Sequence, residues 1–200
     1  MTSYLDRIME TIGRPENQPP PDWSPIHDCL GLRLPRAFVE FTEAYGFALI
    51  GSIELAHPSP TADGFRDLLS CIKAGSDYLE RRRAGRQWGP RPSVPHPIHP
   101  EPEGLIRWGQ SINREAFFFL AWPAREPDEW PILWLDMVDD ENAWTEFEPP
   151  FDRFMYDLVT GAVPERLLRG RTFDDYEPLC NGLDGRPVHR PRPPQPTDGP

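Results

Sequence analysis

The chain has 200 residues and a formal net charge of −11, and 38% of its residues are apolar. This length, with seven Trp and eleven Phe, suffices for one folded domain with a buried core. The charge disfavours direct binding of nucleic acid, because an acidic field repels phosphates. The longest apolar stretch, Ala116 to Trp122, is too short to span a bilayer. Since the N-terminus also lacks a secretory signal, we expect a cytoplasmic protein without a membrane segment.

The first predicted element is a short amphipathic helix. Apolar residues recur at helical spacing from Leu5 to Ile12, Ser3 is placed to cap the start, and Gly13 is placed to end it. A loop rich in proline is expected over 15–25, where it carries Trp23 toward the next helix.

Two further helices and one strand are predicted before residue 90. Pro35 stands where a helix begins, and Gly46 stands where that helix ends. Residues 47–55 are apolar and partly β-branched, which predicts a strand with a bend at Gly51. Residues 64–83 predict a third helix, which ends in a basic run that favours the helix dipole.

The rest of the chain predicts a loop, short strands and a last helix. Six of the thirteen residues from Pro90 to Pro102 are proline, so this segment is expected to be a loop. Strands are predicted at 105–108, 116–122, 132–135 and 144–147, and a helix at 151–158 that Gly161 ends. Residues 178–200 are too polar and proline-rich to order themselves and are predicted to form a disordered tail. This order of elements predicts an α+β fold in one domain.

The most unusual segment is 128–150, which holds eight acidic residues and no Lys or Arg. The acids are Asp128, Glu129, Asp136, Asp139, Asp140, Glu141, Glu146 and Glu148. Trp130, Trp134 and Trp144 are interleaved with them. Two interpretations stay open: a surface that receives a basic partner, or tryptophans of the core beneath a solvated acidic face.

Metal and catalytic motifs are weak. The acids after Asp136 do not match a calcium loop, and His96, His99 and Glu101 lie in the proline-rich loop without a fourth ligand. Cys29, Cys71 and Cys180 form no metal or disulfide pattern, and burial of Cys29 and Cys71 as small hydrophobes is the preferred interpretation. We therefore expect no metal, no cofactor and no enzymatic activity, with a hydrolase built on the acids of 128–148 as the third hypothesis.

Several segments, read in order, resemble the SUKH superfamily of Smi/Knr-like domains. These are Leu34-Pro35-Arg36-Ala37-Phe38, Tyr45-Gly46, Ile50-Gly51, Trp108-Gly109, Trp130-Pro131-Ile132, Trp144, Phe151-Asp152-Arg153-Phe154 and Thr160-Gly161. The resemblance covers residues 1–165 apart from the loop at 90–102, and leaves 166–177 as a C-terminal extension before the tail. It implies a curved, mostly antiparallel sheet backed by helices. It also implies an immunity protein, because many bacterial members neutralise a toxin, often a nuclease, by tight binding.

Together these observations predict a non-enzymatic immunity protein that blocks a basic toxin domain through an acidic and aromatic surface. The residues expected to bind the partner are Asp136, Asp139, Asp140, Glu141, Trp144 and Glu146. The alternative hypothesis is a regulatory or scaffold module of the same superfamily, with a signalling protein or an enzyme as its partner.

Overall fold

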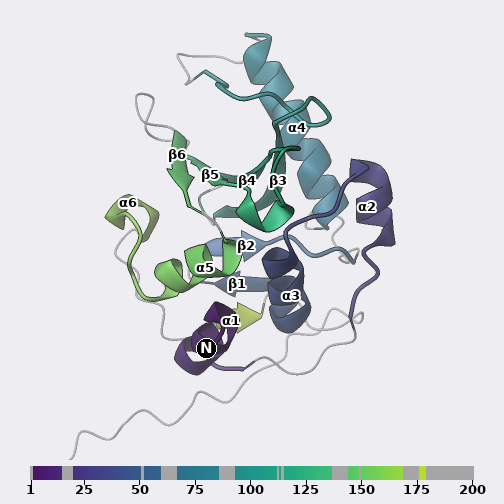
Figure 1. Cartoon of the computed structure of the whole chain (residues 1–200). Helices are drawn as coiled ribbons and strands as arrows, with labels where there is room; N and C mark the ends of the chain where they lie inside the picture. Colours follow the sequence, from purple (N-terminus) through teal and green to yellow (C-terminus); the bar gives the residue numbers. More distant parts are fainter. Residues whose placement is uncertain are drawn as a thin grey trace, which may run out of the picture.

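A computed structural model of the chain shows an open sheet with helices packed against it (Figure 1). The described residues are 2–14, 20–50, 52–59, 67–85, 93–111, 113, 115–136, 144–148 and 150–168, with the backbone of 176–178. Outside these residues lie nearly all of the predicted tail and the residues Asp139, Asp140, Glu141 and Cys180, for which predictions were made above.

The fold is α+β, as predicted. The helices are α1 (Tyr4–Ile12), α2 (Ser24–Leu30), α3 (Arg36–Tyr45), α4 (Leu68–Arg83), α5 (Phe151–Val159) and α6 (Glu165–Leu168), with a 3₁₀ turn η1 (Pro127–Glu129). The strands are β1 (Ala48–Ile50), β2 (Ile53–Leu55), β3 (Gly104–Ser111), β4 (Ala116–Ala121), β5 (Ile132–Leu135), β6 (Trp144–Phe147) and β7 (Tyr176–Pro178). Their order in the sheet is β6-β5-β4-β3-β2-β1-β7, and every described pair is antiparallel.

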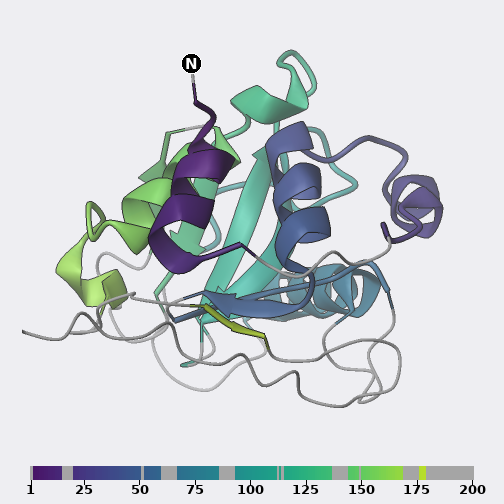
Figure 2. The same cartoon turned by 90° about the horizontal axis from the view of Figure 1, so that it is seen from below.

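The central strands are buried on both faces. All residues of β4 and β5 are buried, and their side chains alternate between two hydrophobic clusters. We call the side with Phe117, Phe119 and Trp134 the aromatic face; α1, α3 and α5 contribute to its cluster. The opposite side, the α4 face, carries Phe118 and Leu133 and is joined by residues of α4 and the proline-rich loop. Figure 2 shows α1 alongside α5, with α3 nearby.

The helix ends follow local sequence signals, as expected. The Ser3 side chain accepts a hydrogen bond from the amide of Asp6 at the start of α1, and Gly13 follows its last residue. Pro35 precedes α3, and Gly46 ends it with φ of +65°, a conformation that glycine adopts without strain. Asp67 caps α4, and its last turn carries the expected basic run.

Two sequence predictions before residue 60 need correction. The prediction of a loop carrying Trp23 onward missed α2, which has Pro25 in its first turn and ends at Gly31 in the left-handed conformation. Proline is tolerated there because the first amides of a helix need no intrahelical acceptor. The predicted single strand over 47–55 is a hairpin, in which Leu49 lies opposite Glu54.

The C-terminal extension adds a strand. Residues 176–178 form β7, which pairs with β1 at the edge of the sheet, so Pro178 belongs to a strand and not to the predicted tail. In the described part of the chain, no helix combines the length and the apolar character that crossing a membrane requires.

Candidate functional site

The structure separates the residues predicted to bind a partner. Asp136 directly follows β5 and is only 4% exposed, so it does not belong to an exposed acidic surface. Its position explains this, because it continues a strand whose residues are all buried. Glu146 on β6 is exposed, as a partner contact requires.

Trp144 links the proline-rich loop to the sheet. Its indole Nε1 donates a hydrogen bond of 2.8 Å to the carbonyl oxygen of Ser93, and its ring lies 5.7 Å from the ring of Phe118. These contacts hold the proline-rich loop against the α4 face. Trp130 and Trp134 are buried, so the interpretation of these two tryptophans as core residues is right.

Three acidic side chains from distant parts of the sequence meet where α3 and α5 begin. Asp128 on η1 accepts a hydrogen bond of 2.9 Å from the amide of Ala37, an amide in the first turn of α3 that needs an outside acceptor. Glu40 lies one turn further along α3, and Asp152 lies in the first turn of α5. We call Glu40, Asp128 and Asp152 the acidic cluster.

Electrostatics within the acidic cluster is unfavourable. Burial raises the pKa of Asp152 above its ordinary value, and hydrogen bonds from the backbone amides of Arg153 and Asp152 act against this rise. The charges of Asp128 and Glu40 add smaller contributions that raise the pKa. Arg36 partly offsets the charges of Glu40 and Asp128: its Nε lies 2.6 Å from Glu40 Oε1, and both acids raise its pKa. Its side chain is 81% exposed, so the pair is well screened by water.

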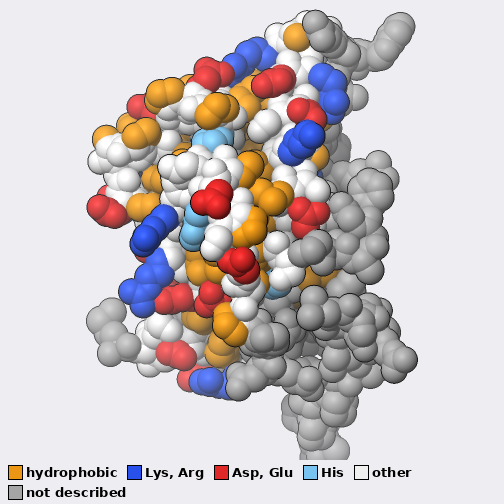
Figure 3. Space-filling view, turned by 90° about the vertical axis from the view of Figure 1, so that its right-hand side faces the viewer, with side chains coloured by type: hydrophobic (Ala, Val, Ile, Leu, Met, Phe, Trp, Pro, Cys, Tyr) orange, Lys and Arg blue, Asp and Glu red, His pale blue; other side chains and the backbone are white. Residues whose placement is uncertain are grey.

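The face that bears α2 and α4 has a different charge pattern. Figure 3 shows acidic and basic side chains interspersed over this face, with hydrophobic atoms between them. Such a mixture gives no field of one sign. The acidic cluster, at the start of α3 and α5, is a candidate for contact with a charged partner because it brings three carboxylates together.

A second candidate site is a cavity of about 260 Å³ between α4 and the strands β2 and β3. Arg107 Nη2 donates a hydrogen bond of 2.8 Å to Gln110 Oε1, and Gln110 Nε2 donates one of 2.7 Å to Glu54 Oε2. All three side chains line the cavity and are half-buried. The amide of Gln110 thus joins a cation on one side to a carboxylate on the other.

A β-bulge in β3 makes this arrangement possible. Arg107 lies opposite Phe118, and Gln110 lies opposite Ala116, while Trp108 is the extra residue between them. In a regular strand, side chains three residues apart point to opposite faces. The bulge instead directs both Arg107 and Gln110 toward α4, and leaves Trp108 in the aromatic cluster.

Gly75, in the interior of α4, leaves room for the Arg107 side chain. A Cβ atom at Gly75 would lie 2.6 Å from Cβ and 2.9 Å from Cδ of Arg107. Glycine within a helix costs about 1 kcal/mol relative to alanine. Because residue 75 is glycine, the aliphatic part of the Arg107 side chain packs directly against the helix.

The cavity contains a cysteine of low reactivity. Cys71 lines it, and burial raises the pKa of this thiol to about 11. A thiol with that pKa stays protonated at neutral pH and is a poor nucleophile. Cys29 is exposed, which corrects the expectation that it is buried, because α2 turns it toward solvent.

The histidines make local contacts. Burial lowers the pKa of His57 to about 4, so it is neutral at pH 7, and its Nδ1 accepts a hydrogen bond from the amide of Ser59. His99 Nε2 lies 3.0 Å from the carbonyl oxygen of Leu30, and Glu101 pairs with Arg83 at 2.9 Å. Among the described residues, no group of three His, Cys, Asp or Glu side chains is arranged to hold a metal ion.

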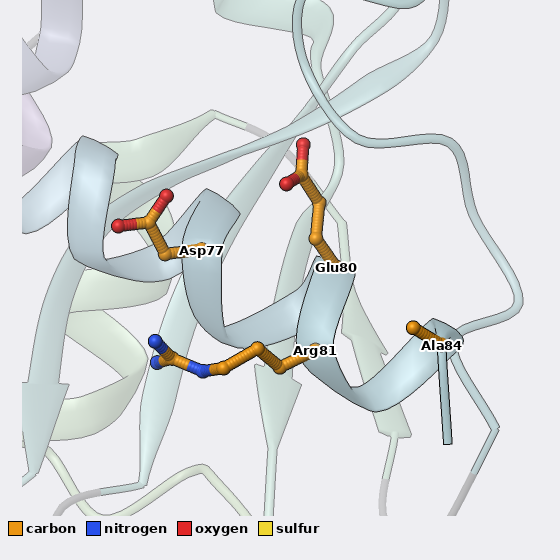
Figure 4. Close-up of a pocket in the computed structure, with 4 residues that line it drawn as sticks. All are labelled: Asp77, Glu80, Arg81 and Ala84. Atoms are coloured by element: carbon orange, nitrogen blue, oxygen red, sulfur yellow. The ribbon is translucent and has the colours of Figure 1, made fainter. Parts of the chain in front are cut away.

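A hollow on the outer side of α4 does not form a site. Figure 4 shows Asp77, Glu80, Arg81 and Ala84, the described residues that line it. Asp77, Glu80 and Arg81 belong to this helix and Ala84 directly follows it, and Asp77 and Arg81 extend to the same side. No second element brings a described side chain to face them, so we interpret this surface as a solvated helix face.

Comparisons with protein-family models, with curated proteins and with solved structures found no match. The assignment of function therefore depends on the two candidate sites themselves.

The sequence did not predict that the residues of either candidate site come together. Asp128 was noted as one of eight acids, but its approach to the start of α3 depends on residues 91 positions apart. Arg107 lies in the predicted strand 105–108, and Gln110 lies just beyond it. A period of two continued through the strand would have put the two side chains on opposite faces. The one available signal was glycine, at Gly75 in a helix and at Gly109 in a strand.

Proposed function

We propose that the chain is a non-enzymatic immunity protein, similar to those of the SUKH superfamily, that neutralises a toxin by binding it. The partner would be a basic protein domain, most simply a nuclease whose cleft for phosphates is positively charged. The site of contact would be the acidic cluster together with exposed acids around it, such as Glu129 and Glu148.

The observation that carries this proposal is the convergence of three carboxylates from separate elements near the start of α3 and α5. Glu40, Asp128 and Asp152 come from three separate elements, and the charges of the first two act on the third. Like charges held together by a fold are unfavourable in the free protein, and a cationic partner relieves them. Binding of such a partner would therefore lower the pKa of Asp152 and release any proton that it holds.

Net charge and aromatic surface support the same proposal. A chain with a net charge of −11 attracts a basic domain over long range, which speeds the encounter. Trp122, half-buried and five residues before η1, provides apolar area, with the guanidinium of Arg125 4.0 Å above its ring. Interfaces commonly draw binding energy from such Trp and Arg side chains.

The test begins with the product of the gene adjacent to the one that encodes this chain. We expect the two purified proteins to form a stable complex, and co-expression of this chain to remove the toxicity of the other. Reversing two exposed acids, in the double variant Glu40→Lys and Glu129→Lys, should slow association by about tenfold and reduce its dependence on salt.

A matched control reverses two exposed acids of α4, Asp77→Lys and Glu80→Lys, and should leave association within about twofold of the original chain. A third variant reverses Asp139, Asp140 and Glu141, the predicted contacts outside the described residues. If association is unchanged in the first variant and slow in the third, the interface lies at Asp139, Asp140 and Glu141, as the sequence predicts. A complex with a non-toxic signalling protein would instead favour the regulatory module.

A further inference from the structure

The cavity beneath α4 has no part in the proposed binding of a toxin, yet three unfavourable features of the chain meet there. Gly75 weakens the interior of a helix, Trp108 interrupts the ladder of β3, and Arg107 and Glu54 are charges withdrawn halfway from water. Departures from local rules that converge on one place are typical of functional sites. A role in folding alone would be met more simply by apolar residues, as on the rest of the α4 face.

The geometry points to a binding site for a small zwitterion of the α-amino acid type in this cavity. Arg107 would hold the carboxylate of the ligand, and Glu54 would hold its ammonium group. Gln110 would keep the two protein charges apart and correctly oriented, since both ends of its amide are already engaged.

The free hydrogen-bonding capacity of the two charges supports this assignment. Arg107 uses Nε toward the carbonyl oxygen of Gly109 and Nη2 toward Gln110, which leaves Nη1 without a partner in the described part of the chain. Glu54 uses Oε2 toward Gln110, which leaves Oε1 as an acceptor. The site therefore offers donors on one side and an acceptor on the other.

Charge selects the class of ligand. A simple anion would be drawn to Arg107 but repelled by Glu54, and a simple cation would meet the reverse. A molecule that carries both charges a few ångströms apart satisfies both residues at once. An α-amino acid is the smallest common molecule of that kind.

The dimensions agree with a ligand of this size. The two hydrogen bonds through Gln110 place the Glu54 carboxylate within about 8 Å of the Arg107 guanidinium. An amino acid with a hydrogen bond of about 2.8 Å at each end spans a similar length. The volume of about 260 Å³ is near the lower limit for small-molecule pockets. Phe47, Leu55 and Ala74 form an apolar part of the wall, which favours a ligand with an apolar side chain.

The experiment screens the proteinogenic L-amino acids one by one against the full chain by saturation-transfer difference NMR, followed by calorimetry on the strongest binder. We expect binding by one amino acid or a few with apolar side chains. The N-acetylated and the C-amidated forms of the best binder each lose one charge, and each should bind about tenfold or more weakly. If no amino acid binds, or if both blocked forms bind as well as the zwitterion, the proposal is wrong.

Variants assign the binding to this cavity. Arg107→Gln and Glu54→Gln should each weaken binding by about 10- to 100-fold, which is the range for loss of a charged hydrogen bond. The matched controls Arg81→Gln and Glu80→Gln, on the exposed side of α4, should bind as the original chain does. If Arg107→Gln does not fold, the nearly isosteric Glu54→Gln decides. Equal binding by Glu54→Gln and the original chain would overturn the proposal. Toxin binding is measured separately, so failure here leaves the proposed function standing.

Discussion

The two faces of the sheet are built from the same strands and differ in what covers them. On the aromatic face, Phe38 of α3 packs against Trp108, Phe119 and Phe151, with ring centroids 5.2 to 6.1 Å apart. On the α4 face, an apolar cluster extends over β3, β4 and β5, but toward β2 it gives way to the cavity with Arg107 and Glu54.

This difference shows how one strand serves both stability and a candidate site. Within β3, Trp108 is fully buried in the aromatic cluster, while its neighbour Arg107 is half-buried on the other side. Burial of large aromatic rings supplies most of the favourable free energy of folding in such a layer. The α4 face contains the costly features, Gly75 and the bulge, and the aromatic face can compensate for them.

The largest expected loss of stability comes from a substitution in the aromatic face. Phe38 is fully buried and touches four aromatic rings, so Phe38→Ala should lower the free energy of unfolding by about 3–5 kcal/mol. Urea denaturation measures this. The matched control is Val39→Ala, half-buried on the same helix, which should cost about 1 kcal/mol or less. Equal losses in the two variants would contradict the assignment of the core to this face.

A smaller effect probes the α4 face. Alanine favours a helix by about 1 kcal/mol over glycine, yet Gly75→Ala should destabilise the chain by about 1–3 kcal/mol, because the new Cβ meets the stem of Arg107. The unfolding free energy in urea reports the sign directly. Lys73→Ala, exposed on the same helix, should stay within about 0.5 kcal/mol. If Gly75→Ala is instead more stable, Arg107 or the helix shifts at little cost, and the expected clash is wrong.

The smallest expected effect compares how the charge of an acid affects stability in the acidic cluster and at an isolated surface position. The pKa of Asp152 is raised in the folded chain, so stability falls as the pH rises from the ordinary value of 3.8 through the raised pKa, and the full cost is present above it. Asp152→Asn should therefore raise the melting temperature at pH 7, and the gain should vanish as the pH falls below the ordinary value of 3.8.

The exposed residue Asp22 provides a control of opposite sign. Its pKa is lowered by a hydrogen bond from the amide of Ser24, so its charged form stabilises the folded chain above the ordinary pKa, and this contribution is lost as the pH falls. Asp22→Asn should lower the melting temperature slightly at pH 7. The same direction of change in both variants would contradict the opposite pKa shifts of Asp152 and Asp22.

Sequence reasoning was accurate where the signal is local and failed where distant residues meet. The ends of α1 and α3 follow from Ser3, Gly13 and Gly46, and the residues of β5 and β6 match their predicted ranges. The pattern of acids around Asp136 suggested an exposed surface, but a buried strand carries Asp136 inward. Composition records how many charges a segment has, and it does not record which way the backbone turns them.

By itself the sequence determined the fold class and most helix and strand positions, because caps, prolines, glycines and periodicity act within a few residues of one another. Only the tertiary structure decided which charges come together. Asp128 reaches the start of α3, and Glu54 reaches Gln110, through packing between strands and helices far apart in the chain. The bulge in β3 then decides that Arg107 and Gln110 share a face, which no count of alternating residues reveals.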